Sequence, residues 1–390
     1  MGKAKVLDFF KKYTMVLALV LVFIFFSVAT GGKLILPQNF TNLIAQNAYV
    51  YVLATGMLLC ILTGGNIDLS VGSVVCFVGA VGAVAMETWK LNGFVATIIV
   101  LALGLVIGAF QAYWIAFVRV PPFIVTLAGM LMFRGLSNVV LDGLTVSLSN
   151  NSFMRAFGGG SDCYIPDVAS GGMFNILALI VGIGACVIYI ITSVMGRIKK
   201  AKKGYAVDSI VGFIVKTIII VGVVLLVTYE LASYKGIPTV LIWVGVVVGI
   251  YSYITSKTTT GRYFYAVGGN EKATKLSGIN TNKVYFLAYT NMGLLAALAG
   301  LLTIARLTSS QPTYGTNYEM DAIGSCFIGG ASAYGGIGTV PGVIIGATLM
   351  GVINQGMSIM GVDANWQKVV KGVVLLVAVI FDVVSKRQKD

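Results

Sequence analysis

The sequence predicts an all-α, polytopic integral membrane protein with about 10–12 transmembrane helices, some broken by glycine, and with both termini cytoplasmic. Three observations predict this class. The 390 residues are 57% hydrophobic and only 11% charged, whereas a soluble domain carries roughly 25% charged residues. Apolar segments of about 20 residues, the length that crosses the hydrocarbon, recur along the chain. The basic residues gather in alternate connecting segments.

The candidate spans follow one another along most of the chain. They lie near 14–30, 43–62, 69–86, 94–117, 122–141, 173–195, 210–231, 237–256, 284–304, 342–361 and 366–384. One further stretch, 321–340, is apolar but rich in glycine, and it either spans the bilayer or re-enters it. The first stretch could pass for a secretory signal, but no small-residue cleavage site follows it, so we expect a retained first helix.

Membrane orientation explains the net charge of +13 better than nucleic-acid binding does. If the N-terminus is cytoplasmic and the chain alternates, most of the 27 Lys and Arg fall on the inner side, including the runs 197–203 and 386–387. This positive-inside distribution predicts a lipid bilayer around the chain and no nucleic-acid partner. The same alternation makes 142–172 an extracytoplasmic loop, 173–231 an inserted helix pair with a basic cytoplasmic linker, and 257–283 a cytoplasmic segment.

The residue types needed for catalytic, metal or cofactor chemistry are missing or scattered. The chain contains no histidine, which removes the usual general base and the commonest metal ligand. Its five cysteines have no CxxC spacing, so neither a zinc site nor a disulfide framework is indicated. No phosphate loop of the type GxxxxGKS or GxxxxGKT occurs. We therefore expect no metal, no cofactor and no catalytic residue, and not an enzyme.

The stretch LTGGNIDLSVGS, Leu62–Ser73, interrupts two apolar runs with polar residues. A carboxylate is costly in hydrocarbon, so Asp68 is a candidate site residue by default. It precedes a fresh apolar helix, where an acidic cap satisfies free backbone donors and complements the helix dipole. Arg134 is the other charge that the predicted spans place well inside the membrane; it either snorkels, pairs within the bundle, or serves the site.

A second interruption, Phe327–Thr339, is richer still in glycine. Non-helical backbone at membrane depth is tolerated only against protein or a wet cavity, and glycine-broken segments in corresponding halves indicate the substrate path of a transporter. Close packing of small residues is the alternative. The predicted pathway residues are Gly64, Gly65, Asn66, Asp68, Ser70, Arg134, Gly329, Gly330, Gly335, Gly336 and Gly338.

The cytoplasmic stretch GRYFYAVGGNEKATKLSGIN, Gly261–Asn280, predicts a docking element. Gly268 and Gly269 read as a flexible turn, and Asn270 as the cap of a short amphipathic helix that ends at Ser277. Held between two spans, such a helix suits contact with a partner protein, although a plain surface loop has the same periodicity.

Three blocks together resemble the permease subunits of carbohydrate-uptake ABC importers of the ribose/xylose/galactose class: Leu62–Ser73, Ala266–Asn280, and Tyr318–Ser325 with Phe327–Thr339. The extra helix pair is more similar to the longer permeases for xylose or multiple monosaccharides. The resemblance implies a multi-pass protein of a prokaryotic cell membrane, working with a separate ATP-binding subunit, an extracytoplasmic sugar-binding protein and a second permease copy. It also implies that the cytoplasmic block couples to the ATPase through Gly268, Gly269, Asn270, Ala273, Ser277, Gly278 and Ile279.

Other functions stay open at this point. A nucleoside or branched-chain amino-acid permease of an ABC importer would share the same architecture. An ion-coupled secondary transporter would also have glycine-broken helices, but it usually needs protonatable groups in its core, and the predicted spans offer little beyond Asp68. A membrane enzyme lacks support from any catalytic arrangement.

Overall fold

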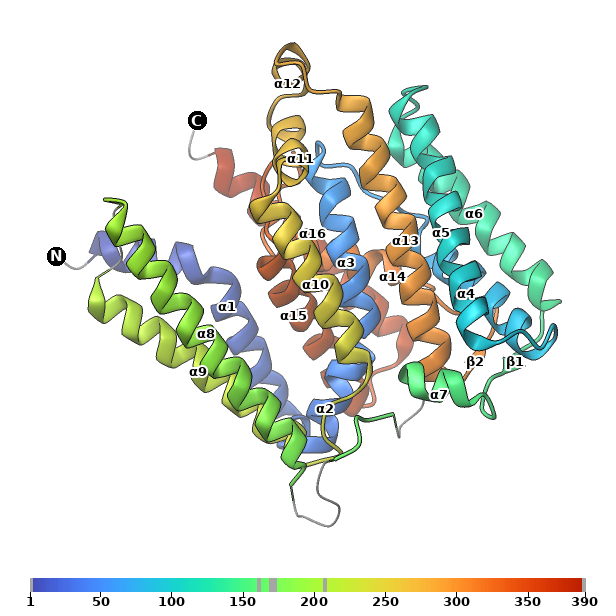
Figure 1. Ribbon diagram of the computed structural model, residues 1–390, viewed down its shortest axis with the longest axis horizontal. Helices are drawn as coiled ribbons and strands as arrows, with labels where there is room; N and C mark the ends of the chain where they lie inside the picture. Colours follow the sequence, from blue (N-terminus) through green and yellow to red (C-terminus); the bar gives the residue numbers. More distant parts are fainter. Residues whose placement is uncertain (1–2, 160–162, 168–173, 206–208, 388–390) are drawn as a thin grey trace. The chain divides into compact units, whose positions relative to one another are not determined.

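The protein is almost entirely α-helical in the computed structural model, which describes residues 3–159, 163–167, 174–205 and 209–387 (Figure 1). The helices are α1 (Lys3–Ala29), α2 (Pro37–Gln46), α3 (Ala48–Leu62), α4 (Val71–Glu87), α5 (Gly93–Ala116), α6 (Pro122–Leu141), α7 (Ser152–Gly158), α8 (Ile176–Lys202), α9 (Ile210–Ala232), α10 (Val240–Lys257), α11 (Thr259–Gly269), α12 (Glu271–Leu276), α13 (Thr281–Leu307), α14 (Tyr318–Ile328), α15 (Val340–Ile359) and α16 (Ala364–Arg387). A short 3₁₀ turn, Lys33–Ile35, and two strands, β1 (Val146–Ser147) and β2 (Ser309–Ser310), complete the elements.

The predicted polytopic membrane protein is confirmed by the lengths and apolar character of these helices. Within the described residues, eight segments are long and apolar enough to cross a membrane: Pro37–Leu62, Gly93–Ala116, Pro122–Leu141, Ile176–Lys202, Gly212–Ala232, Val240–Lys257, Thr281–Leu307 and Val340–Ile359. Thr14–Ala29 and Val71–Glu87 are shorter apolar helices. The predicted span 43–62 is the second part of a longer segment, α2 and α3, which is interrupted at Asn47.

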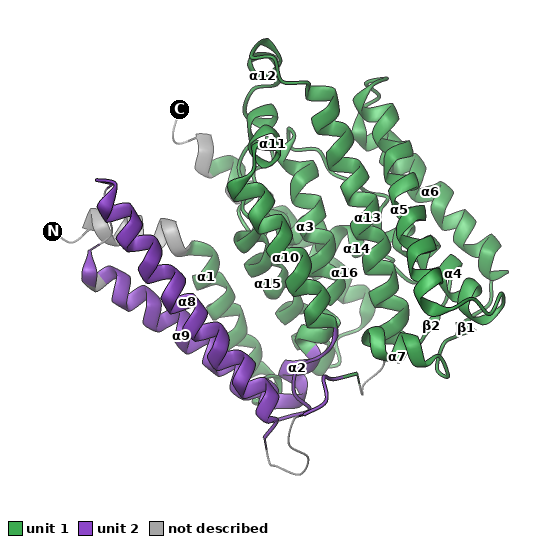
Figure 2. Cartoon of the chain, viewed as in Figure 1, with its two compact units in different colours: residues 1–34, 43–163, 240–390 green, residues 35–42, 164–239 purple. Residues whose placement is uncertain are grey.

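The chain divides into two compact units (Figure 2). The second unit contains residues 35–42 and 164–239 and thus includes most of the predicted inserted helix pair. Its helices α8 and α9 pack against each other, with Gly182 so close to Thr228 that a Cβ atom would overlap the threonine side chain. The basic run 197–203 lies mostly on the last turns of α8 rather than in a linker, where lysine is compatible with helix and complements the dipole. Residues 160–162, 168–172 and 206–208 of the predicted loop and linker lie outside the described residues.

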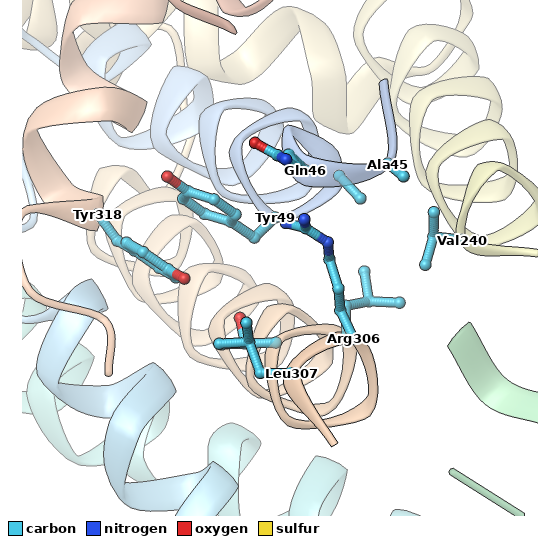
Figure 3. Close-up of a pocket in the computed structure, with 10 residues that line it drawn as sticks. Ala45, Gln46, Tyr49, Val240, Arg306, Leu307 and Tyr318 are labelled. Atoms are coloured by element: carbon cyan, nitrogen blue, oxygen red, sulfur yellow. The ribbon is translucent and has the colours of Figure 1, made fainter. Parts of the chain in front are cut away.

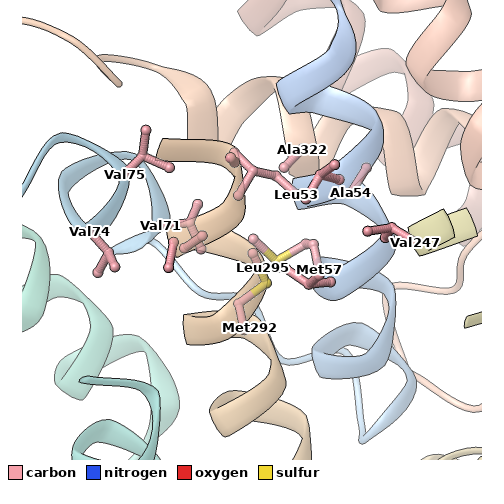
Figure 4. Packing of buried hydrophobic residues seen from close by; sticks show 14 of the residues in the cluster. Leu53, Ala54, Met57, Val71, Val74, Val75, Val247, Met292, Leu295 and Ala322 are labelled. Atoms are coloured by element: carbon pink, nitrogen blue, oxygen red, sulfur yellow. The ribbon is translucent and has the colours of Figure 1, made fainter. Parts of the chain in front are cut away.

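In the first unit, α3 and α13 form the centre of the core. In their most apolar windows, 78% and 72% of the residues are buried. Met57 of α3 lies against Met292 and Leu295 of α13, and Leu53 lies in the same cluster (Figure 4). Helix α13 also packs closely on α5, where Gly104 and Gly108 meet Gly293 backbone to backbone, as small residues allow in membrane helix pairs.

The stretch 321–340 is not a single helix. Helix α14 has 11 residues, which gives about 16 Å, half of the hydrocarbon thickness. Residues 309–317 before it are mostly non-helical, and residues 329–339 after it are irregular up to the start of α15. The glycines explain the interruption, because Gly330, Gly335 and Gly336 have positive φ angles of 84°, 85° and 70° that do not continue a helix.

Candidate functional site

The first interruption folds back alongside the helix that precedes it. Helix α3 ends at Leu62 and α4 begins at Val71. Gly64 and Gly65 have φ angles of 120° and 76°, a reversal that side chains disfavour. The backbone N–H of Asp68 then lies 3.5 Å from the sulfur of Met57, which is more than one turn back in α3. The segment is therefore irregular backbone enclosed by protein, as membrane depth requires.

Asp68 is buried, with 3% of its surface exposed, and it organises the start of α4 indirectly. Its Oδ1 accepts hydrogen bonds from the backbone N–H and the hydroxyl of Ser70, at 2.8 and 2.6 Å. Gln111 of α5 donates to the same hydroxyl oxygen at 2.9 Å. Ser70, not Asp68, occupies the N-cap position of α4, but the Asp68 carboxylate does satisfy a backbone donor there, the N–H of Ser70. The carboxylate thus fixes the residue at the cap position and links it to α5.

The second interruption is held by three hydrogen bonds from different helices. The N–H of Gly336 donates to the carbonyl of Leu62 at 3.0 Å. The Tyr265 hydroxyl of α11 donates to the carbonyl of Gly338 at 2.9 Å. The N–H of Ala333 donates to the carboxylate of Asp382 in α16 at 3.1 Å. Residues 331–339 are thus attached at once to α3, α11 and α16.

The two interruptions and the end of α11, in the predicted cytoplasmic segment, meet at one place, which we call the glycine junction: Gly64, Gly65, Gly268, Gly269, Gly335 and Gly336. A Cβ atom at Gly335 would lie 2.5 Å from the Gly64 backbone, and one at Gly65 would overlap the Ala333 carbonyl. A Cβ atom at Gly268 would overlap the Leu62 carbonyl. Three segments far apart in the sequence therefore touch backbone to backbone. Gly65, Gly268 and Gly335 leave no room for a Cβ atom, whereas a Cβ atom at Gly64 or Gly269 would meet no close neighbour.

The remaining predicted pathway residues lie around this contact or away from it. Gly329 packs on Gly342 of α15, and a Cβ atom at Gly330 would meet only the flexible Met15 side chain. Arg134 of α6 donates to the carbonyls of Pro312 and Tyr314, at 3.0 and 2.7 Å. The arginine thus holds the non-helical segment before α14 through backbone oxygens, and it is not part of the glycine junction.

The predicted coupling helix has the expected cap. Asn270 accepts a hydrogen bond from the N–H of Ala273 at 2.9 Å, and α12 ends before Ser277. Leu276 is 90% exposed at the end of this helix. Gly268 and Gly269, in contrast, are the last residues of α11 and not a free turn. Their backbone packs against Leu62 and Gly336 in the glycine junction.

An ion pair that the sequence did not indicate anchors this helix. Arg119, in the connection between α5 and α6, lies 2.8 Å from the Glu271 carboxylate and 5.3 Å from the centre of the Tyr285 ring. Tyr285 of α13 donates to the other Glu271 oxygen at 3.1 Å. Burial alone would raise the pKa of Glu271, but hydrogen bonding and the positive charge of Arg119 hold it below its ordinary value. Helix α12, the predicted coupling helix, is thus fixed to α13 and to the α5–α6 connection.

A polar cavity lies at the opposite end of α13 from the coupling helix. We use this name for the space of about 210 Å³ lined by Leu43, Gln46, Asn47, Tyr49, Arg306, Gly351, Asn354 and Gln355. A smaller cavity of about 60 Å³ shares Gln46, Tyr49 and Arg306 with it and reaches Tyr318 (Figure 3). The sequence did not indicate either cavity, because their walls come from six helices: α2, α3, α10, α13, α14 and α15.

A charge pair with a buried carboxylate lies beside these cavities. Tyr49 and Tyr318 stack with ring centres 3.6 Å apart and planes 15° from parallel. The Tyr49 hydroxyl donates to Asp321 at 2.8 Å, and Lys371 of α16 lies 2.9 Å from the same carboxylate. The interpretation that only Asp68 and Arg134 carry charge well inside the spans is therefore incomplete. No group of three or more metal-ligating side chains occurs among the described residues.

Comparisons with known proteins cover nearly the whole chain. Residues 39–379 match the profile of the family described as branched-chain amino acid transport system / permease component. The xylose transport system permease protein XylH of Haemophilus influenzae is 37% identical over 376 residues, 96% of this chain and 97% of that protein. XylH of Escherichia coli K12 is 36% identical over 96% of this chain and 92% of its own length. The ribose import permease protein RbsC of the same strain is 36% identical over 90% of this chain and 87% of its own. No solved structure matches the chain.

Proposed function

The chain belongs to the family of permease components of branched-chain amino acid transport systems, and from this premise we propose that it is the membrane-spanning permease subunit of an ATP-driven ABC importer for a monosaccharide, with D-xylose the foremost candidate. The observation that carries the proposal is the match to a xylose permease over 96% of this chain and 97% of that protein. A match that spans both units favours a sugar over the branched-chain amino acids of the family description.

The partners we propose are a separate ATP-binding subunit, an extracytoplasmic sugar-binding protein and a second copy of the permease. Helix α12 supports the first of these. It is capped, it presents an exposed leucine, Leu276, and it is fixed to the core by Arg119. We place the chain in the inner membrane of a prokaryotic cell, with α12 on the cytoplasmic side, because the basic segments of the sequence lie there.

The glycine junction is the proposed cytoplasmic end of the translocation pathway. Its Gly268 belongs to α11, which leads directly into α12. A movement of α12 imposed by a bound ATPase is therefore passed to Gly64 and Gly335 by backbone contact, without a flexible side chain between. Asn66, Asp68 and Ser70 continue the proposed pathway behind the junction, and Gly329, Gly330 and Gly338 lie in the second interruption. Arg134 supports the pathway from outside by holding residues 312–314.

Reconstitution tests this function. Proteoliposomes that contain the chain and its ATP-binding subunit, with the binding protein outside and ATP inside, should accumulate radiolabelled D-xylose. Leaving out the ATP-binding subunit should abolish accumulation. Accumulation that an ion gradient drives without ATP would make the chain a secondary transporter. Accumulation of L-leucine in place of any sugar would assign it to the amino-acid branch of the family.

A further inference from the structure

The polar cavity contains a buried group without a partner. The Asn354 side-chain oxygen is buried and has no hydrogen-bond partner among the described residues. A buried amide oxygen without a partner costs free energy, so its retention needs an explanation. Gln355, the next residue along α15, also lines the cavity and is 7% exposed. The cavity is far larger than the roughly 10–15 Å³ that one water needs, so there is room for a small organic solute.

The lining suits a neutral, hydroxyl-rich solute. Gln46, Asn354 and Gln355 each present a donor and an acceptor, which matches hydroxyl groups that both donate and accept. Arg306 adds donors, and Tyr49 adds an aromatic face of the kind that small-molecule sites use. A sugar can satisfy the Asn354 oxygen with one hydroxyl while the neighbouring groups bind the others.

The same lining does not suit a branched-chain amino acid. Arg306 could pair with a carboxylate, but the eight lining residues include no acidic side chain to receive an ammonium group. Leu43 is the one aliphatic side chain of any size among them. An aliphatic side chain in the cavity would contact the amides of Asn354 and Gln355. It would bury these amides without forming hydrogen bonds to them, which is costly.

The cavity also lies where a solute would enter. Arg306 is in the last turn of α13, whose first turn adjoins the coupling helix. If the coupling helix is cytoplasmic, the cavity lies towards the extracytoplasmic face, from which a binding protein delivers its ligand. The smaller cavity continues from Gln46 and Tyr49 to Tyr318.

From this lining and position we propose that the polar cavity is a contact site for the monosaccharide inside the permease, with Asn354 and Gln355 as its principal hydrogen-bonding residues. This inference rests on the proposed function. It adds that the permease itself, through this cavity, selects a neutral, hydroxyl-rich solute.

The test compares Asn354→Leu and Gln355→Leu with the control Asn138→Leu, an exposed amide of α6. Each variant is assembled with its ATP-binding subunit and binding protein, and the sugar flux per ATP hydrolysed is measured for D-xylose, D-ribose and D-galactose. Asn354→Leu should lower the flux per ATP about three- to tenfold, the range expected for one lost hydrogen bond. It should also raise the melting temperature of the complex, because the unpaired buried oxygen is removed. The control should change neither quantity.

A structural role for Asn354 predicts the opposite change in stability, namely a lower melting temperature. If Asn354→Leu fails to assemble, Asn354→Ser, which keeps a hydroxyl but shortens its reach, replaces it in the same assay. Unchanged flux per ATP in both cavity variants, with normal flux in the wild type, would overturn the cavity assignment and leave the proposed function intact. A wild-type complex that transports none of the three sugars would instead overturn the proposed function and, with it, the sugar assignment.

Discussion

The two ends of α3 differ in almost every physical respect. Near Ala48 the helix borders the polar cavity, whereas at Leu62, about 21 Å away along the axis, it ends in the glycine junction. The cavity end has space, amide groups, an aromatic stack and an ion pair beside it. At the junction end, Gly65, Gly268 and Gly335 have no space for a Cβ atom, and a backbone hydrogen bond joins Gly336 to Leu62. The difference supports the proposal that polar groups bind a solute at one end of α3 and that glycines close the pathway at the other.

The junction should be the less tolerant end. Gly65→Val places a side chain where a Cβ atom already overlaps the Ala333 carbonyl, on a residue with a φ of 76°. The two interruptions cannot then close on each other, so we expect loss of the assembled complex and of all transport. Size-exclusion chromatography in detergent measures assembly. Gly245→Ala in α10, which meets nothing within 4 Å, is the control and should assemble normally; an intact, active Gly65→Val complex would show that the junction is loose.

The ion pair beside the cavity should show the next largest effect. Lys371→Met leaves the Asp321 carboxylate, which is only 2% exposed, without its cation. An uncompensated buried charge costs about 3–5 kcal/mol. Thermal unfolding of the purified complex should report this loss.

Removing both charges tests the cause. In the double variant Asp321→Asn with Lys371→Met, most of the lost stability should return, because no buried charge is left without a partner. A double variant as unstable as the single one would show that packing of the lysine stem, rather than charge, is what the site needs.

The coupling helix should affect association and not stability. Leu276→Asp changes a side chain that is 90% exposed, and exposed substitutions usually stay within about 0.5 kcal/mol of wild-type stability. The permease should therefore insert and fold, yet fail to retain the ATP-binding subunit in a pull-down. The neighbouring exposed residue Lys275, changed to Gln, serves as control. Retention of the ATP-binding subunit by the Leu276 variant would contradict the docking role.

The smallest effect should come from the pair that anchors α12. Arg119→Gln removes a largely exposed ion pair, and such pairs contribute at most about 1 kcal/mol. Because the pKa of Glu271 is lowered, the pair is fully present above the unfolded value and is lost as the pH falls through the folded one. Between pH 8 and 5 Glu271 stays charged and the ion pair stays intact. The affinity for the ATP-binding subunit should therefore show no pH dependence that arises from this pair. If the Glu271→Gln variant and the wild type lose the ATP-binding subunit over the same pH range below 5, a group other than Glu271 titrates there.

Much of the fold and part of the site could be predicted from local patterns. Periodicity and composition identify most helices, and Asn270 caps α12 because its partner lies three residues away. Gly64 and Gly335 were each predicted as pathway residues from the glycine-rich stretch around them. Nothing in either stretch shows that the two residues touch. The cavity and its neighbouring ion pair were missed for a physical reason: Tyr49 and Asp321 lie 272 residues apart in the sequence and meet only in the packed fold. An ordinary tyrosine or lysine in an apolar run carries no local sign of such a partner.

Thiol labelling at the two ends tests the central claim most directly. Cys163 is replaced by serine, since the other four cysteines are buried, and either Asn354→Cys or Ser332→Cys is then introduced. Ser332, in the second interruption, is 1% exposed. A small soluble thiol reagent should label the Asn354 variant in the resting complex, and sugar-loaded binding protein should protect it. The same reagent should label the Ser332 variant only while ATP is hydrolysed. Equal labelling of the Ser332 variant at rest and during ATP hydrolysis would contradict the account of an open polar end and a closed glycine end.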